Sequence, residues 1–130
     1  MIAMSDYLEG KFLDHFLGTA STSAPAAVYL SLHTADPTDA GTGSEVSTSG
    51  TAYVRKAITF SAASSGSTSN SGAVEFDTAT SSWGTIGWIG VWDASSGGNL
   101  LFHGALDASK TIASGDAFKV NASGITLTAA

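Results

Sequence analysis

The sequence predicts a mainly β fold, an antiparallel β-sandwich or small barrel with one N-terminal α-helix. Three observations predict it. Apolar residues recur every four positions only near the N-terminus, and they alternate in short runs from about residue 27 to residue 128. Gly, Ser, Asn and Asp separate these runs roughly every eight to twelve residues, the spacing of a sandwich. The length of 130 residues is that of a single domain, spanning residues 1–130.

The helix is expected over about residues 5–17. Ser5 is a suitable N-cap and Gly18 a suitable stop. Leu8, Phe12 and Phe16 recur every four residues and form an apolar stripe. Because an isolated helix of about twelve residues is marginally stable, the stripe must pack against another surface. That surface is either the sheet of the same domain or a neighbouring subunit.

The first half of the β region contains two predicted strands separated by loops. Residues 28–33 alternate apolar and polar, which predicts that Ser31 and His33 point away from the core. Residues 35–50 form a long acidic loop. The strand at 53–60 is expected to place three residues on one face (Val54, Ile58 and Phe60) and three on the other (Tyr53, Arg55 and Thr59). Residues 61–72 contain no large apolar side chain and are expected to form a surface loop.

The second half is predicted to consist almost entirely of strands. A short strand contains Val74 and Phe76, and residues 85–92 pair with 99–106 as a hairpin. Residues 117–121 and 125–128 form a second candidate hairpin. In the strand at 85–92 the alternation groups three residues on one face: Ile86, Trp88 and Trp92. The glycines within strand patterns indicate either bulges that curve the sheet or a groove for a ligand: Gly87, Gly90 and Gly104.

The amino-acid composition argues against several classes of function. The net charge is −6 and only 12% of residues are charged, so a phosphate-binding patch for nucleic acid is not expected. The absence of Cys removes disulfides, thiolate nucleophiles and Cys-based zinc sites. No apolar run approaches the ~18 residues of a membrane span, and the N-terminus does not resemble a signal peptide. We therefore expect no nucleic-acid or membrane partner.

The sequence offers no recognisable catalytic motif. It contains no Gly-x-Ser-x-Gly elbow, and His15, His33 and His103 lie in unrelated elements without the spacing of metal ligands. We expect no enzymatic activity, no cofactor and no metal site. The acidic loop could supply oxygen ligands to calcium, but its spacing does not match an EF-hand, and a solvated loop explains it equally.

Tryptophan residues raise the possibility of carbohydrate binding. Trp83 lies between Ser82 and Gly84, in a loop setting that could expose its ring, and Tyr53 is a second candidate for stacking on a ligand. The competing interpretation places the aromatic rings in the core.

Several stretches together resemble a family of small phage and prophage proteins usually labelled tail fibre or virion protein. These stretches are SDYLE at 5–9, VYLSLHTADPTDAGTGSEVS at 28–47, YVRK at 53–56, WGT at 83–85, GVWDA at 90–94 and GNLLFHGAL at 98–106. The resemblance extends over nearly the whole chain.

The resemblance implies a non-enzymatic structural protein of a bacteriophage virion, assembled in the host cytoplasm. Its partners would be other virion proteins of the capsid or tail, and the chain would be a homo-oligomer or bound in a lattice. Two placements remain open, a capsid decoration (cement) protein and a tail-fibre-like subunit. A receptor- or carbohydrate-binding module of the tail is the alternative function.

A repeated subunit of this kind would act through contact area. Six residues are the candidates for intersubunit contacts, three on the helix and three in the acidic loop: Leu8, Phe12, Phe16, Asp36, Asp39 and Glu45. Both elements lack an obvious local partner in the sequence, which makes them available for contact with a neighbour.

Overall fold

The computed structural model describes residues 2–129 and contains one helix and nine strands in that range. The elements in chain order are β1 (Ile2–Met4), α1 (Asp6–Phe16), β2 (Val28–His33), β3 (Lys56–Ile58), β4 (Ser67–Ser69), β5 (Val74–Glu75), β6 (Gly84–Trp92), β7 (Leu100–Ile112), β8 (Lys119–Val120) and β9 (Thr126–Thr128). This confirms the predicted mainly β class with a single N-terminal helix.

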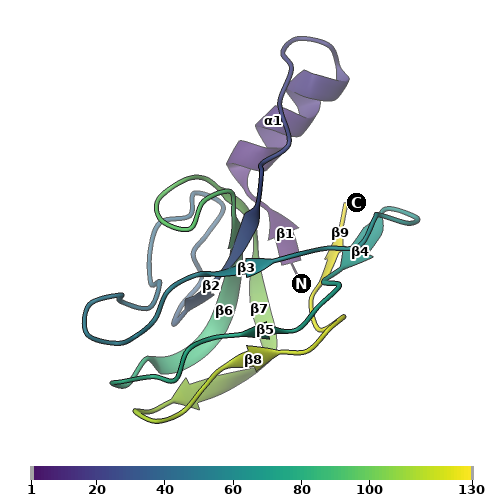
Figure 1. The fold of residues 1–130 in the computed structure, drawn as a ribbon. Coiled ribbons are helices and arrows are strands. Elements are labelled where there is room, and N and C mark those ends of the chain that lie inside the picture. The colour runs from purple at the N-terminus through teal and green to yellow at the C-terminus, as the bar shows by residue number, and fades with distance from the viewer. Residues whose placement is uncertain (1, 130) are drawn as a thin grey trace.

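The strands form one larger and two smaller antiparallel sheets. The five-stranded sheet has the order β1-β7-β6-β2-β3, and the pairs β4-β9 and β5-β8 form the two smaller sheets. Figure 1 shows α1 projecting beyond the sheets, on the same side as the short strand β1. The arrangement is that of an antiparallel sandwich.

The core lies between the five-stranded sheet and the smaller sheets. Leu30 of β2 and Ile86 of β6 are fully buried on the larger sheet, while Val74 of β5 and Leu127 of β9 cover them from the other layer. Aromatic rings fill one end of this core. The ring centroids of Tyr53 and Phe76 are 6.0 Å apart, and those of Tyr53 and Trp83 are 5.5 Å apart.

The helix forms where the sequence predicts it. The side chain of Ser5 accepts a hydrogen bond from the N–H of Leu8 at 3.2 Å, the expected N-cap interaction. Gly18 follows the helix with a φ of 80°, a left-handed conformation that glycine adopts without strain.

Strand β2 differs from its predicted alternation because it is buried on both faces at its C-terminal end. The side chains of Ser31 and His33 are buried rather than directed to solvent, so that prediction was wrong. The Nε2 of His33 lies 2.7 Å from the Oγ of Ser31, and Trp92 donates its ring N–H to the same Oγ at 2.8 Å. Trp92 and the acidic loop together cover this second face of β2. The polar side chains that alternate along the strand are therefore buried.

The region 53–60 contains a shorter strand than predicted, and its residues do not keep the predicted alternation. Ile58 is 2% exposed and Tyr53 is 1% exposed, whereas Val54 is 47% exposed, so the predicted grouping of Val54 with Ile58 opposite Tyr53 was wrong. The Tyr53 hydroxyl accepts a hydrogen bond from the N–H of Leu32 at 3.1 Å and donates one to Glu45 at 2.7 Å. These partners draw the tyrosine inward.

The segment 61–72 contains β4 and is not only a surface loop. Its anchor is a polar side chain, Asn70, which is fully buried. The Asn70 amide donates to the carbonyl of Asn121 at 2.9 Å and accepts from the N–H of Ile125 at 2.9 Å. These bonds attach the segment to the C-terminal strands without any large apolar residue.

The position of Gly87 in β6 supports the interpretation as a bulge. The β6–β7 register shifts between Ile86 and Trp88, around Gly87. The shift returns Ile86 to the core beside Ile89, so the predicted grouping of Ile86 with Trp88 and Trp92 on one face was wrong.

The two predicted hairpins had different outcomes. β6 and β7 pair as predicted, although β7 continues to Ile112. The second hairpin does not form, because β8 pairs with β5 and β9 pairs with β4. Both strands therefore hold distant segments against the sandwich.

Candidate interaction surface

The exposed face of α1 is the most unusual surface of the described residues. No residue of α1, whose whole length the structure describes, is buried. Phe12 is 46% exposed and Phe16 is 71% exposed, and Leu13 and Leu17 widen the same region at 53% and 74%. We call these four residues the helix patch. Exposed apolar areas of this kind mark interaction sites more often than isolated surface residues do.

The helix is fixed at its base. The N–H of Ser5 bonds to the carbonyl of Leu101 at 2.8 Å, and the Ser5 hydroxyl donates to the carbonyl of Leu100. The N–H of Asp6 lies 3.3 Å from the carbonyl of Asp39 in the acidic loop. The first turn is therefore held by β7 and the acidic loop, while the helix patch lies toward the distal end that projects in Figure 1.

A hollow of about 300 Å³ adjoins the helix patch. It lies between α1 and residues 22–25, which follow the helix in the chain. Its lining includes Leu8, Phe12, Phe16 and Pro25. The rings of Phe12 and Phe16 have centroids 5.0 Å apart on its border. Leu8 is partly buried, so this predicted interface residue contributes to the base of the surface rather than to its tip.

The acidic-loop candidates divide between two places. Asp36 and Asp39 both face His103 of β7: the Nε2 of His103 lies 2.6 Å from Asp39 Oδ1, and its Nδ1 lies 3.4 Å from Asp36 Oδ1. This group lies beside the first turn of α1, to which Asp39 is hydrogen-bonded. Glu45 lies elsewhere, and both of its carboxylate oxygens are bonded within the chain.

Arg55 holds Glu45 and is the central residue of a cluster that sequence reasoning missed. Its Nε donates to Glu45 Oε2 at 2.9 Å and a terminal nitrogen donates to Glu45 Oε1 at 2.8 Å, a bidentate pair. The other terminal nitrogen donates to the carbonyls of Ala94 and Gly97 at 3.0 and 2.8 Å. Arg55 is the only arginine of the chain, which is the one signal that could have drawn attention to it.

The electrostatics of this cluster follow from its burial. Burial pushes the pKa of Glu45 upward, but hydrogen bonds from Arg55 and Tyr53 outweigh it and hold that pKa below the ordinary value. Burial, followed by the charge of Glu45, raises the pKa of Tyr53. Burial lowers the pKa of His33, against the opposing effect of its hydrogen bond to the Gly43 carbonyl. The hydrogen bonds of Arg55 connect the acidic loop, at Glu45, to the loop between β6 and β7, at Ala94 and Gly97.

The two candidate ligand-stacking residues are both in the core. Trp83 is 4% exposed and donates its ring N–H to the carbonyl of Thr51 at 2.8 Å. Tyr53 is 1% exposed. Neither ring presents a face to a ligand, which corrects the expectation that they could be solvent-facing. The packing of the aromatic rings against one another explains their burial.

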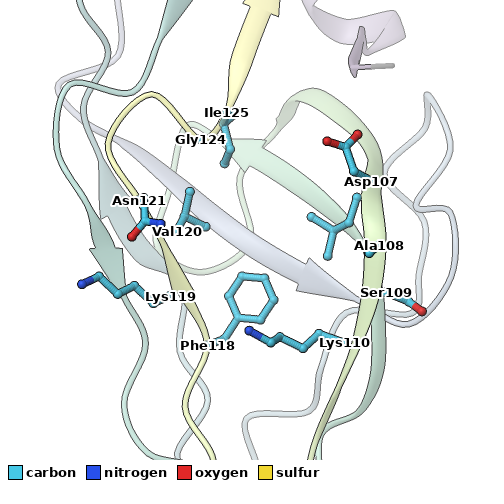
Figure 2. Close-up of a pocket in the computed structure, with 11 residues that line it drawn as sticks. Asp107, Ala108, Ser109, Lys110, Phe118, Lys119, Val120, Asn121, Gly124 and Ile125 are labelled. Carbon is cyan, nitrogen blue, oxygen red and sulfur yellow. The ribbon is translucent and has the colours of Figure 1, made fainter.

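A second concave surface lies between β7 and β8. Figure 2 shows Phe118 in the middle of this groove of about 390 Å³, with Lys110 reaching toward it from β7 and Val120 on the opposite wall. Lys119 points away from the groove, and its Nζ lies 3.3 Å from a carboxylate oxygen of Glu75. Within residues 2–129, no group of three His, Asp or Glu side chains is arranged so that it could hold a metal ion, and this includes Asp36, Asp39 and His103.

Comparison with known proteins identifies the family. A family model described as Podophage GP4 fiber I protein gp80 matches residues 3–128. The chain belongs to this family of podophage fibre proteins. A search of curated proteins found no significant match.

Family membership makes this fibre-family protein a phage structural protein and confirms the resemblance seen in the sequence. The match extends through α1 as well as the sandwich. Among the residues described, no helix has the length and apolar character of a membrane span. The helix patch is thus an element of a virion protein and is its best candidate for contact with a neighbour.

Proposed function

We propose that this fibre-family chain is a non-enzymatic, repeated accessory subunit on the particle surface, held in place through its helix patch by a neighbouring virion subunit. One observation carries the proposal: α1 projects from the sandwich with Phe16 71% and Leu17 74% exposed. An eleven-residue helix gains little stability alone, so its apolar face requires a covering surface.

Energetic considerations support this assignment. Burying the helix patch removes apolar surface from water, which stabilises the contact by about 25 cal/mol for each Å² buried. A single contact of this size is modest, but repetition around a symmetric particle multiplies it through avidity. The family description favours a fibre-like placement over head decoration. The two candidate residues for stacking on a carbohydrate, Trp83 and Tyr53, are buried in the core and do not support the carbohydrate-binding alternative.

The test is incorporation of a Phe12→Ser/Phe16→Ser double variant into particles. We expect the number of copies per purified particle, measured by quantitative mass spectrometry, to fall at least about tenfold. The melting temperature of the free protein should change little, because neither ring lies in the core: Phe12 is 46% and Phe16 is 71% exposed.

Val54→Ser is the matched control, because Val54 is 47% exposed and Phe12 is 46% exposed. This variant should be incorporated like the wild type. Normal incorporation of the double Phe variant would refute the proposed attachment through α1.

A further inference from the structure

One edge of the long strand β7 is only partly covered. β6 pairs with the first edge, and β1 pairs with the other edge at residues 102–104. Over residues 105–111 no strand of the described part of the chain pairs with this second edge. The register with β6 shifts in the same stretch, so that residues 106–109 have only Gly87 opposite them. Four successive residues of β7 therefore have no strand partner for their backbone groups on the outer edge and no regular one on the inner edge.

The next strand in the chain does not close this edge. β8 follows β7 after the turn at residues 113–118, but it pairs with β5, so the two consecutive strands diverge. The groove of about 390 Å³ lies between them (Figure 2). A second hollow of about 280 Å³ shares Leu106 and Ile125 with this groove and extends along β7 to Ile2 of β1. We call the two together the β7 groove, and it runs along the open edge up to β1.

The strand β1 shows what kind of group this edge accepts. It is an extended segment, antiparallel to β7, and its residue Ile2 packs against the core. The β7 groove continues the same edge and adds an apolar lining that includes Phe118, Val120 and Ile125. A row of backbone N–H donors and C=O acceptors is matched by the backbone of another extended chain, as in strand addition. The complement of the groove is therefore a single extended peptide segment.

The charges along the groove define this segment further. Lys110 and Asp107 both line the groove, and neither has an ion-pair partner within residues 2–129. Figure 2 shows Lys110 extending toward Phe118, whereas Lys119 points away and pairs with Glu75. A segment antiparallel to β7 passes Lys110 first and Asp107 about three residues later. It is complementary when it carries an acidic residue at the first of these positions and a basic residue at the second.

We propose that the β7 groove binds an extended segment of another virion protein, which adds to β7 as an antiparallel strand and ends next to Ile2 of β1. The acidic and basic side chains of the segment pair with Lys110 and Asp107. The contact uses a surface separate from the helix patch, so the inference goes beyond the proposed function. It gives this structural protein a site that recognises a partner by backbone pairing and by the order of two charges.

A second copy of this chain does not supply such a segment. The connecting residues 17–27 and 61–66 are uncharged, and the acidic loop at 35–50 contains no basic residue. The β7 edge of a second copy carries both charges, but it forms one wall of its own groove, opposite β8. Two such edges meet only if β8 is displaced in both copies. The partner is therefore a protein of different sequence.

A peptide titration tests the chemistry of the groove in the free protein, and its result does not depend on the helix patch. The probe is the peptide ETVKVT with blocked ends, which places glutamate opposite Lys110, lysine opposite Asp107 and valines toward the apolar lining. In NMR spectra we expect the peptide to shift the amide signals of residues 105–111 and to give backbone NOEs to β7. The charge-exchanged peptide KTVEVT has the same composition and should bind at least about tenfold more weakly.

Lys110→Met and Lys119→Met are matched variants, because both lysines are exposed and only Lys110 extends into the groove. Lys110→Met should weaken the binding of ETVKVT about fivefold, whereas Lys119→Met should leave it unchanged. Equal binding of the two peptides, or an equal loss in the two variants, would overturn the proposed strand addition. An absence of shifts along β7 at about 1 mM peptide would overturn it as well.

Photo-cross-linking in intact particles identifies the partner. A photoreactive phenylalanine derivative replaces Ala108, which is exposed and lines the groove, and in a control it replaces the exposed Ala63, which does not line it. We expect Ala108 to cross-link to another virion protein, within a segment where a basic residue follows an acidic one by about three positions. Cross-linking to a second copy of this chain, or an equal yield at Ala63, would show that the groove does not bind the proposed partner.

Discussion

Arg55 lies over the ring of Trp92, with 3.9 Å between the guanidinium carbon and the ring centroid. The same guanidinium makes the bidentate pair with Glu45 and donates to two carbonyls of the β6–β7 loop. One side chain thus fixes the acidic loop, the β6–β7 loop and the buried tryptophan to one another. A planar, five-donor group is required for all of these contacts at once.

Arg55→Lys should therefore be strongly destabilising despite retaining the charge. An ammonium group makes neither the bidentate contact nor the flat stacking contact, so we expect a loss of about 2–4 kcal/mol in urea unfolding. Lys56→Ala is the control, because the carboxylate of its partner Asp77 is exposed to solvent and the ion pair should contribute at most about 1 kcal/mol. Equal effects of the two substitutions would contradict the central role of Arg55.

The buried His33 should make stability depend on pH. Because burial lowers its pKa in the folded protein, the unfolded chain binds the proton more readily. The stabilisation from the neutral ring is complete above the ordinary value of 6.5 and is lost as the pH falls toward the lower folded pKa.

His33→Gln should flatten the pH dependence of the unfolding free energy below about pH 6.5. Denaturant titrations of the variant and the wild type at a series of pH values measure the difference. A slope equal to that of the wild type would show that His33 is not the responsible group.

Two glycines should respond in opposite ways to alanine. A Cβ at Gly90 would lie 2.6 Å from Ser31 Oγ and 2.9 Å from Trp92 Nε1, so Gly90→Ala should cost about 1–3 kcal/mol. At Gly10 in α1 a Cβ meets nothing within 4 Å, and Gly10→Ala should stabilise the helix by about 0.5–1 kcal/mol. Thermal unfolding shows whether each substitution raises or lowers the stability. If Gly90→Ala left the stability unchanged, close packing around Gly90 would not be the explanation.

The buried amide of Asn70 should not tolerate a carboxylate. Its nitrogen donates to the carbonyls of Gly72 and Asn121, and an aspartate would place an oxygen against each of these acceptors. We expect Asn70→Asp to cost about 2–4 kcal/mol in chemical denaturation. Asn121→Asp, at an exposed side chain, is the isosteric control, and a comparable loss there would argue against a specific function of the Asn70 amide.

The features that the sequence predicted correctly depend on neighbouring residues. The helix followed from Ser5, the four-residue stripe and Gly18, and the β6–β7 hairpin from two apolar runs around a Gly-rich turn. These signals act over a few residues, where spacing determines geometry. The apolar stripe on α1 is visible in the sequence for the same reason, while its contact with a neighbour stays a prediction.

The features that were missed depend on distant contacts. Tyr53 and Trp83 lie among small polar residues, yet they are buried because Phe76 and neighbouring strands arrive from elsewhere in the chain. The partners of β8 and β9 are separated from them by dozens of residues, so local alternation could not reveal the pairing. Arg55 carries no local motif, and its function depends on where Trp92 lies in three dimensions.

The attachment of α1 at Ser5 has a consequence for how such a protein can change. The bonds that orient the helix use the first turn and the end of β7, while the apolar residues of its distal turns contribute nothing to the packed interior. Under the proposed attachment through the helix patch, substitutions in those turns change which neighbour is recognised and leave the sandwich intact. A phage lineage would in that case exchange the surface to which the chain attaches without altering the fold of the chain.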